Sequence, residues 1–211
     1  MTGLREQLRL YLVTDPILCT PFGLVETVQQ AVAGGVTMVQ LRAKDASTPA
    51  RVDMALALKQ ALYGTGVPLI VNDDLEAAIV ADADGAHIGQ GDMPPVQARA
   101  LLGSGKILGL SCETEQTVKA ADPNSVDYLG LGPVFASTTK TDHERPIGFD
   151  GLARLVALTS LPTVAIGGLR PAHQQDVLTS GADGQAVVSA ICGQTDPKAA
   201  AQLFNQTEAP S

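Results

Sequence analysis

Residues 40–44 read QLRAK, so Gln40, Arg42 and Lys44 stand at every second position of a segment that otherwise has the apolar character of a buried strand. Because successive strand side chains point to opposite faces, these three polar residues share one face. Strand-like and helix-like segments alternate around this stretch, and parallel strands in such chains are covered on both faces. The polar row therefore points into an enclosed site. Its two cations indicate an anionic ligand.

Short apolar segments with strand character recur along the whole chain, with helix-like segments between them. The strand-like segments are residues 9–14, 38–42, 68–72, 85–88, 107–111, 128–132, 163–166 and 185–188. The helix-like segments are residues 24–33, 49–63, 74–81, 94–102, 114–121, 149–158, 171–180 and 197–204. Eight such units in 211 residues predict an α/β fold, a single (β/α)8 TIM barrel with parallel strands. An open doubly wound sheet is the alternative.

Composition restricts the class of protein further. We expect one catalytic domain over residues 1–206 and a disordered tail at residues 207–211. The net charge of −8 disfavours nucleic acid or an anionic membrane as a partner, because both require a basic surface. No apolar run approaches the ~18 residues of a membrane span. Three cysteines without a C-x-x-C spacing fit a reducing cytoplasm, so we expect a cytoplasmic protein of undetermined oligomeric state.

Carboxylates follow two of the predicted strands. Asp73 comes directly after residues 68–72, and Asp92 follows residues 85–88 closely. Because barrel strands end on one common face, the two carboxylates can share one Mg²⁺ that completes its shell with water and phosphate oxygens. Local explanations compete with this prediction. Asp73 has the D-x-x-E spacing of a helix capping box, and Asp92 could cap the helix that follows it.

A long connection between residues 132 and 148 is typical of a lid or binding loop. It carries hydroxyls at Ser137, Thr138 and Thr139 and a cation at Lys140, a set that suits a phosphate group. A solvated connection without a role is the alternative.

Two further strand ends have the pattern of a phosphate site. Gly168 and the pair Val188 and Ser189 stand where barrels bind phosphate through backbone N–H groups and a helix N-terminus. A tight turn is the alternative explanation for the glycine. His87, within residues 85–88, is expected to be a hydrogen-bonded interior histidine and not a general base.

Taken together, several separated motifs resemble those of the thiamine-phosphate synthase family. They are QLRAK at 40–44, ND at 72–73, GAHIGQGD at 85–92, Ser111, GPVF at 132–135, TK at 139–140, IGG at 166–168 and VSAI at 188–191. The resemblance covers nearly the whole chain. It implies a transferase that joins 4-amino-2-methyl-5-(diphosphooxymethyl)pyrimidine to 4-methyl-5-(2-phosphoethyl)thiazole and releases pyrophosphate, with one Mg²⁺ in the site.

The resemblance also implies roles for individual residues. The pyrimidine diphosphate would be held by Gln40, Arg42, Lys44, Asn72, Ser111 and Lys140. The thiazole phosphate would be held by Ser137, Thr138, Thr139, Gly168, Val188 and Ser189. Asp73 and Asp92 would hold Mg²⁺, and the catalytic residues would be Lys44, Ser111 and Lys140. They would stabilise the departing pyrophosphate in a dissociative substitution that needs no nucleophilic side chain.

Three positions depart from the family pattern. Ala43 stands where the family commonly has glutamate, Ser137 replaces a threonine, and Glu113 stands where many relatives carry histidine. The similar thiazole tautomerase branch is expected to use that histidine and to lack much of the diphosphate set. A noncatalytic barrel that senses thiamine intermediates is a second alternative. The diphosphate set without the histidine favours the synthase.

Overall fold

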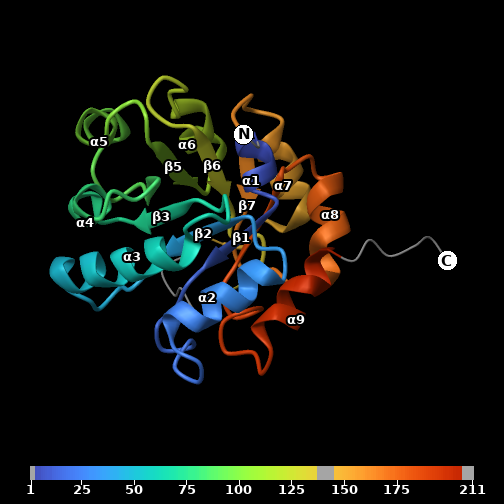
Figure 1. Cartoon of the computed structure of the whole chain (residues 1–211). Helices are drawn as coiled ribbons and strands as arrows, with labels where there is room; N and C mark the ends of the chain where they lie inside the picture. The colour runs from blue at the N-terminus through green and yellow to red at the C-terminus, as the bar shows by residue number, and fades with distance from the viewer. Residues whose placement is uncertain (1–2, 137–144, 206–211) are drawn as a thin grey trace.

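The computed structural model describes residues 3–136 and 145–205. Eight parallel strands close into a barrel in the order of the sequence, and helices surround them (Figure 1). The strands are β1 (Leu10–Val13), β2 (Met38–Leu41), β3 (Leu69–Asn72), β4 (Gly85–Ile88), β5 (Ile107–Cys112), β6 (Tyr128–Leu131), β7 (Thr163–Ala165) and β8 (Gly184–Val187). The closed barrel confirms the predicted (β/α)8 fold and excludes the open doubly wound sheet.

All eight predicted helices are present, with ends that differ by a few residues. The helices are α2 (Leu24–Ala33), α3 (Thr48–Leu62), α4 (Leu75–Val80), α5 (Pro95–Leu102), α6 (Glu115–Ala120), α7 (Gly148–Val156), α8 (Gln174–Thr179) and α9 (Pro197–Gln202). Short 3-10 turns, η1 (Pro171–His173) and η2 (Leu203–Asn205), account for the rest of the last two predicted segments. Among the helices described, none is long and apolar enough to cross a membrane.

One helix was not predicted, α1 (Leu4–Gln7), because its four residues are too few to show a helical period. Leu4 packs against the side chains inside the barrel, and Leu8 belongs to that interior set. Since both residues precede β1, this helix closes the amino-terminal end of the barrel. The open end is the one at which the strands finish.

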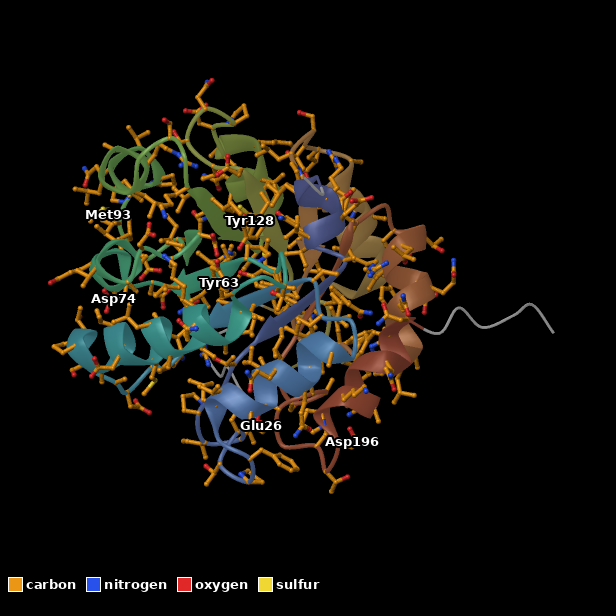
Figure 2. The ribbon with its side chains drawn as sticks, in the orientation of Figure 1. Glu26, Tyr63, Asp74, Met93, Tyr128 and Asp196 are labelled. Atoms are coloured by element: carbon orange, nitrogen blue, oxygen red, sulfur yellow. The ribbon has the colours of Figure 1, made fainter. Side chains whose placement is uncertain are left out.

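Strand side chains alternate between two cores, one between the barrel and the helices and one inside the barrel. The interior set is Leu8, Tyr11, Met38, Ile70, Tyr128, Val164 and Ala186. Tyr128 is labelled among the side chains that project from β6 (Figure 2). Two of these interior side chains are fully buried tyrosines, and their hydroxyls require hydrogen-bond partners.

Gly109 on β5 makes room for this interior. A Cβ at Gly109 would overlap the Tyr128 phenol and the His87 ring. We expect Gly109→Ala to lower the free energy of unfolding by about 1–3 kcal/mol, as overpacking substitutions do, in urea titrations. Gly105→Ala is the matched control, because a Cβ there would meet nothing within 4 Å. Equal stability of the two variants would show that the ring packing is loose.

Candidate active site

A cavity of about 670 Å³ opens at the carboxyl ends of the strands. Its lining includes these residues predicted from the sequence: Gln40, Arg42, Lys44, Asn72, Asp73, Asp92, Ser111 and Val188. Gly168 and Ser189 are not part of the lining, whereas the neighbouring Gly167 is. Ser137, Thr138, Thr139 and Lys140 lie outside the described residues. The fold thus gathers positions from five different strand ends at one opening.

Arg42 follows β2 and has an unusual electrostatic position. Its Nη2 atom is buried and has no hydrogen-bond partner among the described residues. Its backbone N–H donates to Thr14 Oγ1 at 3.2 Å, which ties the segment after β2 to the end of β1. A buried guanidinium nitrogen without a partner is costly, and an oxyanion such as phosphate is its natural complement. This orphaned donor is the observation that best fits an anionic ligand in the cavity.

We expect Arg42→Gln to weaken binding of inorganic pyrophosphate by about 10- to 100-fold, the loss that corresponds to a charge-assisted hydrogen bond. The melting temperature of the ligand-free protein should not fall, because the substitution removes an unpaired buried donor. Calorimetric titration and thermal melts measure the two quantities. Arg9→Gln, at an exposed position just before β1, is the control for the lost charge. Unchanged pyrophosphate affinity in Arg42→Gln would remove Arg42 from the anion site.

Asp73 and Asp92 lie close to one another at the rim of the cavity. Asp73 has a left-handed backbone, φ 61°, and its N–H donates to the His87 carbonyl at 2.8 Å. Asp92 Oδ2 accepts from the Gly89 N–H at 2.7 Å. Burial, together with the neighbouring Asp92 carboxylate, raises the pKa of Asp73 to about 6. A carboxylate whose ionisation is opposed by a neighbouring carboxylate marks a place where a cation would be favoured.

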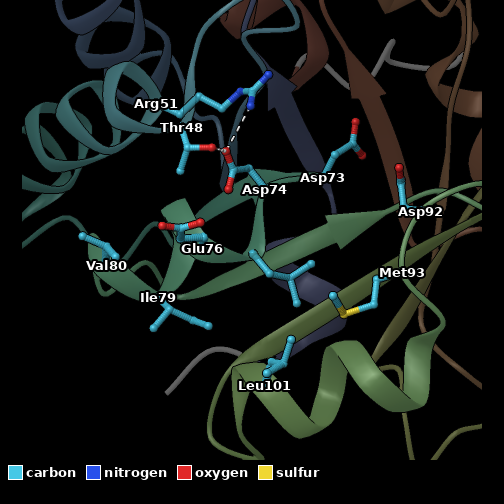
Figure 3. Close-up of a pocket in the computed structure, with 11 residues that line it drawn as sticks. Thr48, Arg51, Asp73, Asp74, Glu76, Ile79, Val80, Asp92, Met93 and Leu101 are labelled. Atoms are coloured by element: carbon cyan, nitrogen blue, oxygen red, sulfur yellow. Dashed lines mark hydrogen bonds and ion pairs between the residues drawn. The ribbon is translucent and has the colours of Figure 1, made fainter.

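The capping role considered for Asp73 belongs to its neighbour. Asp74 is the N-cap of α4, where its Oδ1 accepts from the Ala77 N–H at 2.9 Å. Its Oδ2 receives Thr48 Oγ1 at 2.9 Å and Arg51 Nη1 at 3.0 Å. Figure 3 shows Asp74 turned toward Arg51 and Thr48, while Asp73 projects on the side where Asp92 lies. Burial opposes ionisation of Asp74, but these hydrogen bonds outweigh it and lower its pKa. The capping-box explanation of Asp73 is therefore wrong.

Asp92 is not a helix cap either. Pro94 occupies the N-cap position of α5, and no side chain caps that helix. Both carboxylates are thus without the local structural role that competed with the metal prediction. Among the residues that the structure describes, no group of three or more His, Cys, Asp or Glu side chains is arranged to hold a metal. Asp73 and Asp92 could supply two protein ligands, and water and phosphate oxygens would have to complete a magnesium shell.

A second cavity, of about 650 Å³, lies beside the first and is the one drawn in Figure 3. Asp73 and Asp92 line both cavities. The second is bordered by apolar side chains of α4 and α5, among them Ile79 and Leu101. The hydroxyl and the cation of the second cavity, Thr48 and Arg51, are bonded to Asp74. Because the predicted residues Gln40, Arg42, Lys44, Asn72 and Ser111 line only the first cavity, we take the first as the candidate active site.

The backbone geometry of the turn after β7 accounts for the two glycines in it. Gly167 and Gly168 have φ of 94° and 65°, and a Cβ on Gly168 would come within 2.8 Å of Phe135 Cβ and of the Ala136 carbonyl oxygen. The tight-turn explanation therefore suffices for the glycine pair. A larger side chain at Gly168 would deform the turn and could not report on a ligand.

After β7 and β8, two backbone N–H groups nevertheless have no acceptor among the described residues. The N–H groups of Gly168 and Ser189 donate to no atom of the described residues. After β8, Val188 accepts from the N–H of Cys192 at 2.9 Å, so a turn follows the strand, and the next helix begins only at Pro197. The expected helix N-terminus is thus absent at Ser189. Binding of a phosphate by these two N–H groups stays a prediction.

Tyr11 lines the cavity although it was not predicted to, and His87 is the hydrogen-bonded interior histidine that was expected. His87 is buried, and its two ring nitrogens lie 2.8 Å from Tyr128 Oη and 2.9 Å from Ser111 Oγ. Tyr11 Oη accepts from Gln40 Nε2 at 2.7 Å. Tyr11 could have been found from the sequence as a tyrosine at an inward position of β1, because a buried hydroxyl needs a hydrogen-bond partner.

The charged side chains that line the cavity favour the binding of an additional cation there. Arg42 and Lys44 are the cationic side chains of the described lining, and Asp73, Asp92 and Glu113 are the acidic ones. Without a further cation, this lining would repel a diphosphate as much as attract it. A divalent ion at the carboxylate pair would reverse that balance.

A closed (β/α)8 barrel with cationic, amide and hydroxyl groups at its carboxyl-terminal mouth defines an anion-binding barrel of the kind that acts on phosphorylated small molecules. A family model described as thiamine monophosphate synthase matches residues 10–191. The chain therefore belongs to the thiamine monophosphate synthase family.

Individual relatives agree with that assignment. The chain is 51% identical over 202 residues to a thiamine-phosphate synthase of Psychrobacter sp., with 94% of each chain covered. It is 53% identical over 197 residues to one of Xanthobacter autotrophicus, with 93% of each covered. Among solved structures, a thiamine phosphate pyrophosphorylase from Pyrococcus furiosus matches with a TM-score of 0.87 at 34% identity, over 96% of both chains.

Proposed function

We propose that this protein is a thiamine-phosphate synthase, which joins the diphosphooxymethyl pyrimidine to the thiazole phosphate and releases pyrophosphate. The observation that carries the proposal is the gathering of eight predicted residues, from Gln40 to Val188, around the cavity, in a chain about half identical to curated synthases over nearly its whole length. The substrates would be phosphorylated small molecules, and both would enter at the mouth of the barrel.

The chemistry divides the work between substrate and protein. An aminopyrimidine stabilises positive charge on its methylene carbon, so the C–O bond to the diphosphate can break before the thiazole nitrogen attacks. The protein then has to hold the leaving pyrophosphate and orient the two rings. Arg42 is suited to a diphosphate oxygen because of its orphaned Nη2, and Lys44 lines the same cavity. Ser111 and Asn72 supply neutral hydrogen-bonding groups nearby.

Mg²⁺ would be held by Asp73 and Asp92 and would supply positive charge to the leaving group. Their proximity, the raised pKa of Asp73 and the absence of a capping role for either residue support this assignment. Lys140, Ser137, Thr138 and Thr139 keep the roles that the family resemblance implies, on the diphosphate and on the thiazole phosphate. Gly168, Val188 and Ser189 keep theirs on the thiazole phosphate, supported by the free N–H groups of Gly168 and Ser189.

The thiazole tautomerase alternative receives no support from the cavity. Glu113 lines the cavity, so a carboxyl group occupies the position at which the tautomerase branch is expected to carry histidine. The sensing barrel differs from the synthase only in turnover.

A coupling assay with both substrates, with Mg²⁺ and with excess chelator, tests the proposal. We expect thiamine phosphate and pyrophosphate in equal amounts, and loss of both products when the metal is removed. Tight binding of both substrates without product would instead identify a sensing barrel.

A further inference from the structure

Five side chains inside the barrel form one continuous hydrogen-bonded chain, which we call the polar relay. In order they are Gln40, Tyr11, Tyr128, His87 and Ser111. The successive distances are 2.7 Å, 2.9 Å, 2.8 Å and 2.9 Å. The relay crosses the barrel from β2 through β1, β6 and β4 to β5. Its two ends, Gln40 and Ser111, both line the cavity.

Each link of the polar relay has a direction, because each hydroxyl and each neutral imidazole carries a single polar hydrogen. Gln40 donates its Nε2 hydrogen to Tyr11 Oη. Tyr11 then has to donate to Tyr128, and Tyr128 to His87 Nδ1. The remaining imidazole hydrogen sits on Nε2 and is donated to Ser111 Oγ. The hydroxyl hydrogen of Ser111 is left over and is available to a ligand.

With His87 neutral, only one other arrangement satisfies every group. If the Gln40 amide turns so that Oε1 faces Tyr11, all the bonds reverse, and Ser111 gives its hydrogen to His87. Any mixed arrangement places two hydrogens against each other or leaves a buried hydroxyl hydrogen without an acceptor, which is costly at low dielectric. Burial keeps both tyrosines protonated, since it raises the pKa of Tyr11 and of Tyr128. The two ends of the relay are therefore coupled.

The structure contains the first arrangement, with Gln40 Nε2 on Tyr11. The other amide atom, Gln40 Oε1, receives no hydrogen bond from the residues described and is not among the buried atoms lacking a partner. It is therefore accessible from the cavity that Gln40 lines. One end of the relay offers the cavity an acceptor, and the other end offers it a hydrogen.

We propose that the polar relay makes the cavity select for opposite hydrogen-bonding groups at its two ends, a donor of the ligand at Gln40 and an acceptor of the ligand at Ser111. Tyr11, Tyr128 and His87 act as positioning residues, and none of them needs to react. This inference rests on the proposed function, because the pyrimidine substrate carries both kinds of group, an amino donor and acceptors on its ring and diphosphate. A 4-oxo pyrimidine that presents an acceptor opposite Gln40 Oε1 would favour the turned amide, which reverses the relay and deprives Ser111 of its hydrogen.

Substitutions that cut the relay test this selectivity. Tyr11→Phe and Tyr128→Phe each remove one oxygen from a different place in the relay and keep the ring that packs the core. In the wild type we expect kcat/KM to favour the 4-amino over the 4-oxo pyrimidine diphosphate by roughly 10²-fold or more, as for sites that hydrogen-bond a substrate group. In each variant Gln40 can turn independently of Ser111. The preference should fall by about tenfold.

Tyr63→Phe is the matched control, because Tyr63 is 87% exposed and lies outside the relay. Its substrate preference should equal that of the wild type. Thermal melts establish that the two relay variants are folded. Wild-type preference in a folded Tyr11→Phe or Tyr128→Phe protein would overturn the proposal.

A second measurement needs no turnover. The chain has three histidines, His87, His143 and His173, so the imidazole ¹⁵N spectrum of the wild-type protein can be assigned by replacing His143 and His173 in turn. We expect the Nε2–H tautomer at His87, and the Nδ1–H tautomer would overturn the proposed direction. An inactive protein with the Nε2–H tautomer would reject the proposed function and leave the direction of the relay standing.

Discussion

Asp73→Asn is expected to lower the rate of thiamine phosphate formation by about 10³-fold or more, because it removes one of the two carboxylates assigned to Mg²⁺. Asparagine is preferred to alanine for this test, since Asp73 has φ 61° and asparagine tolerates the left-handed region. Steady-state rates over a range of Mg²⁺ concentrations, with calorimetric titration of Mg²⁺ in the presence of pyrophosphate, give the measurement.

Asp74→Asn is the matched control, one residue further along the chain. It removes the same charge but alters the cap of α4 and the contacts to Thr48 and Arg51. We expect it to lower the free energy of unfolding by about 1–2 kcal/mol and to leave turnover nearly unchanged. An Asp73→Asn protein that melts early but couples the substrates normally at limiting Mg²⁺ would show that the metal lies elsewhere.

Lys140→Ala is expected to lower the rate of the coupling step by about 10²- to 10³-fold, the loss typical of a missing electrostatic stabiliser. The charge inventory of the described lining is the reason. Three carboxyl groups accompany only two cationic side chains there, so a leaving pyrophosphate needs charge from Mg²⁺ and from a residue outside that set. Single-turnover kinetics isolates the step, and thiazole-phosphate affinity should change less.

Lys119→Ala controls for net charge in that experiment. Lys119 is exposed on α6 and pairs with Glu115 at 3.0 Å, at a distance in sequence from every assigned site residue. Lys140→Arg should recover part of the rate because it restores the positive charge. If Lys140→Ala and Lys119→Ala turn over alike, the connection that carries Lys140 has no part in catalysis.

The pattern of polar and apolar residues along the chain was enough to predict the barrel and the candidate site residues at its mouth. Eight strand patterns separated by helix patterns leave few topologies, because parallel strands need crossover helices and both faces of such a sheet are covered. In that setting, alternation at Gln40, Arg42 and Lys44 is informative, since a polar face on a covered strand must have a ligand or a partner. The carboxyl ends of all strands share one face, so Asn72, Asp73, Asp92 and Ser111 could be placed together without coordinates.

The contacts of those side chains depend on residues that are far apart in the chain and meet only in the folded barrel. The spacing of residues in the sequence allowed Asp73 to be the N-cap of α4. In the structure Asp74 is the N-cap, and its second carboxylate oxygen contacts Thr48 and Arg51, which belong to another helix. The orphaned Nη2 of Arg42 depends on what surrounds it in space. The polar relay joins residues 24 to 117 positions apart, so no local pattern could reveal it. Local sequence determines which strands and helices form, whereas hydrogen bonds between distant strands exist only once the barrel has closed.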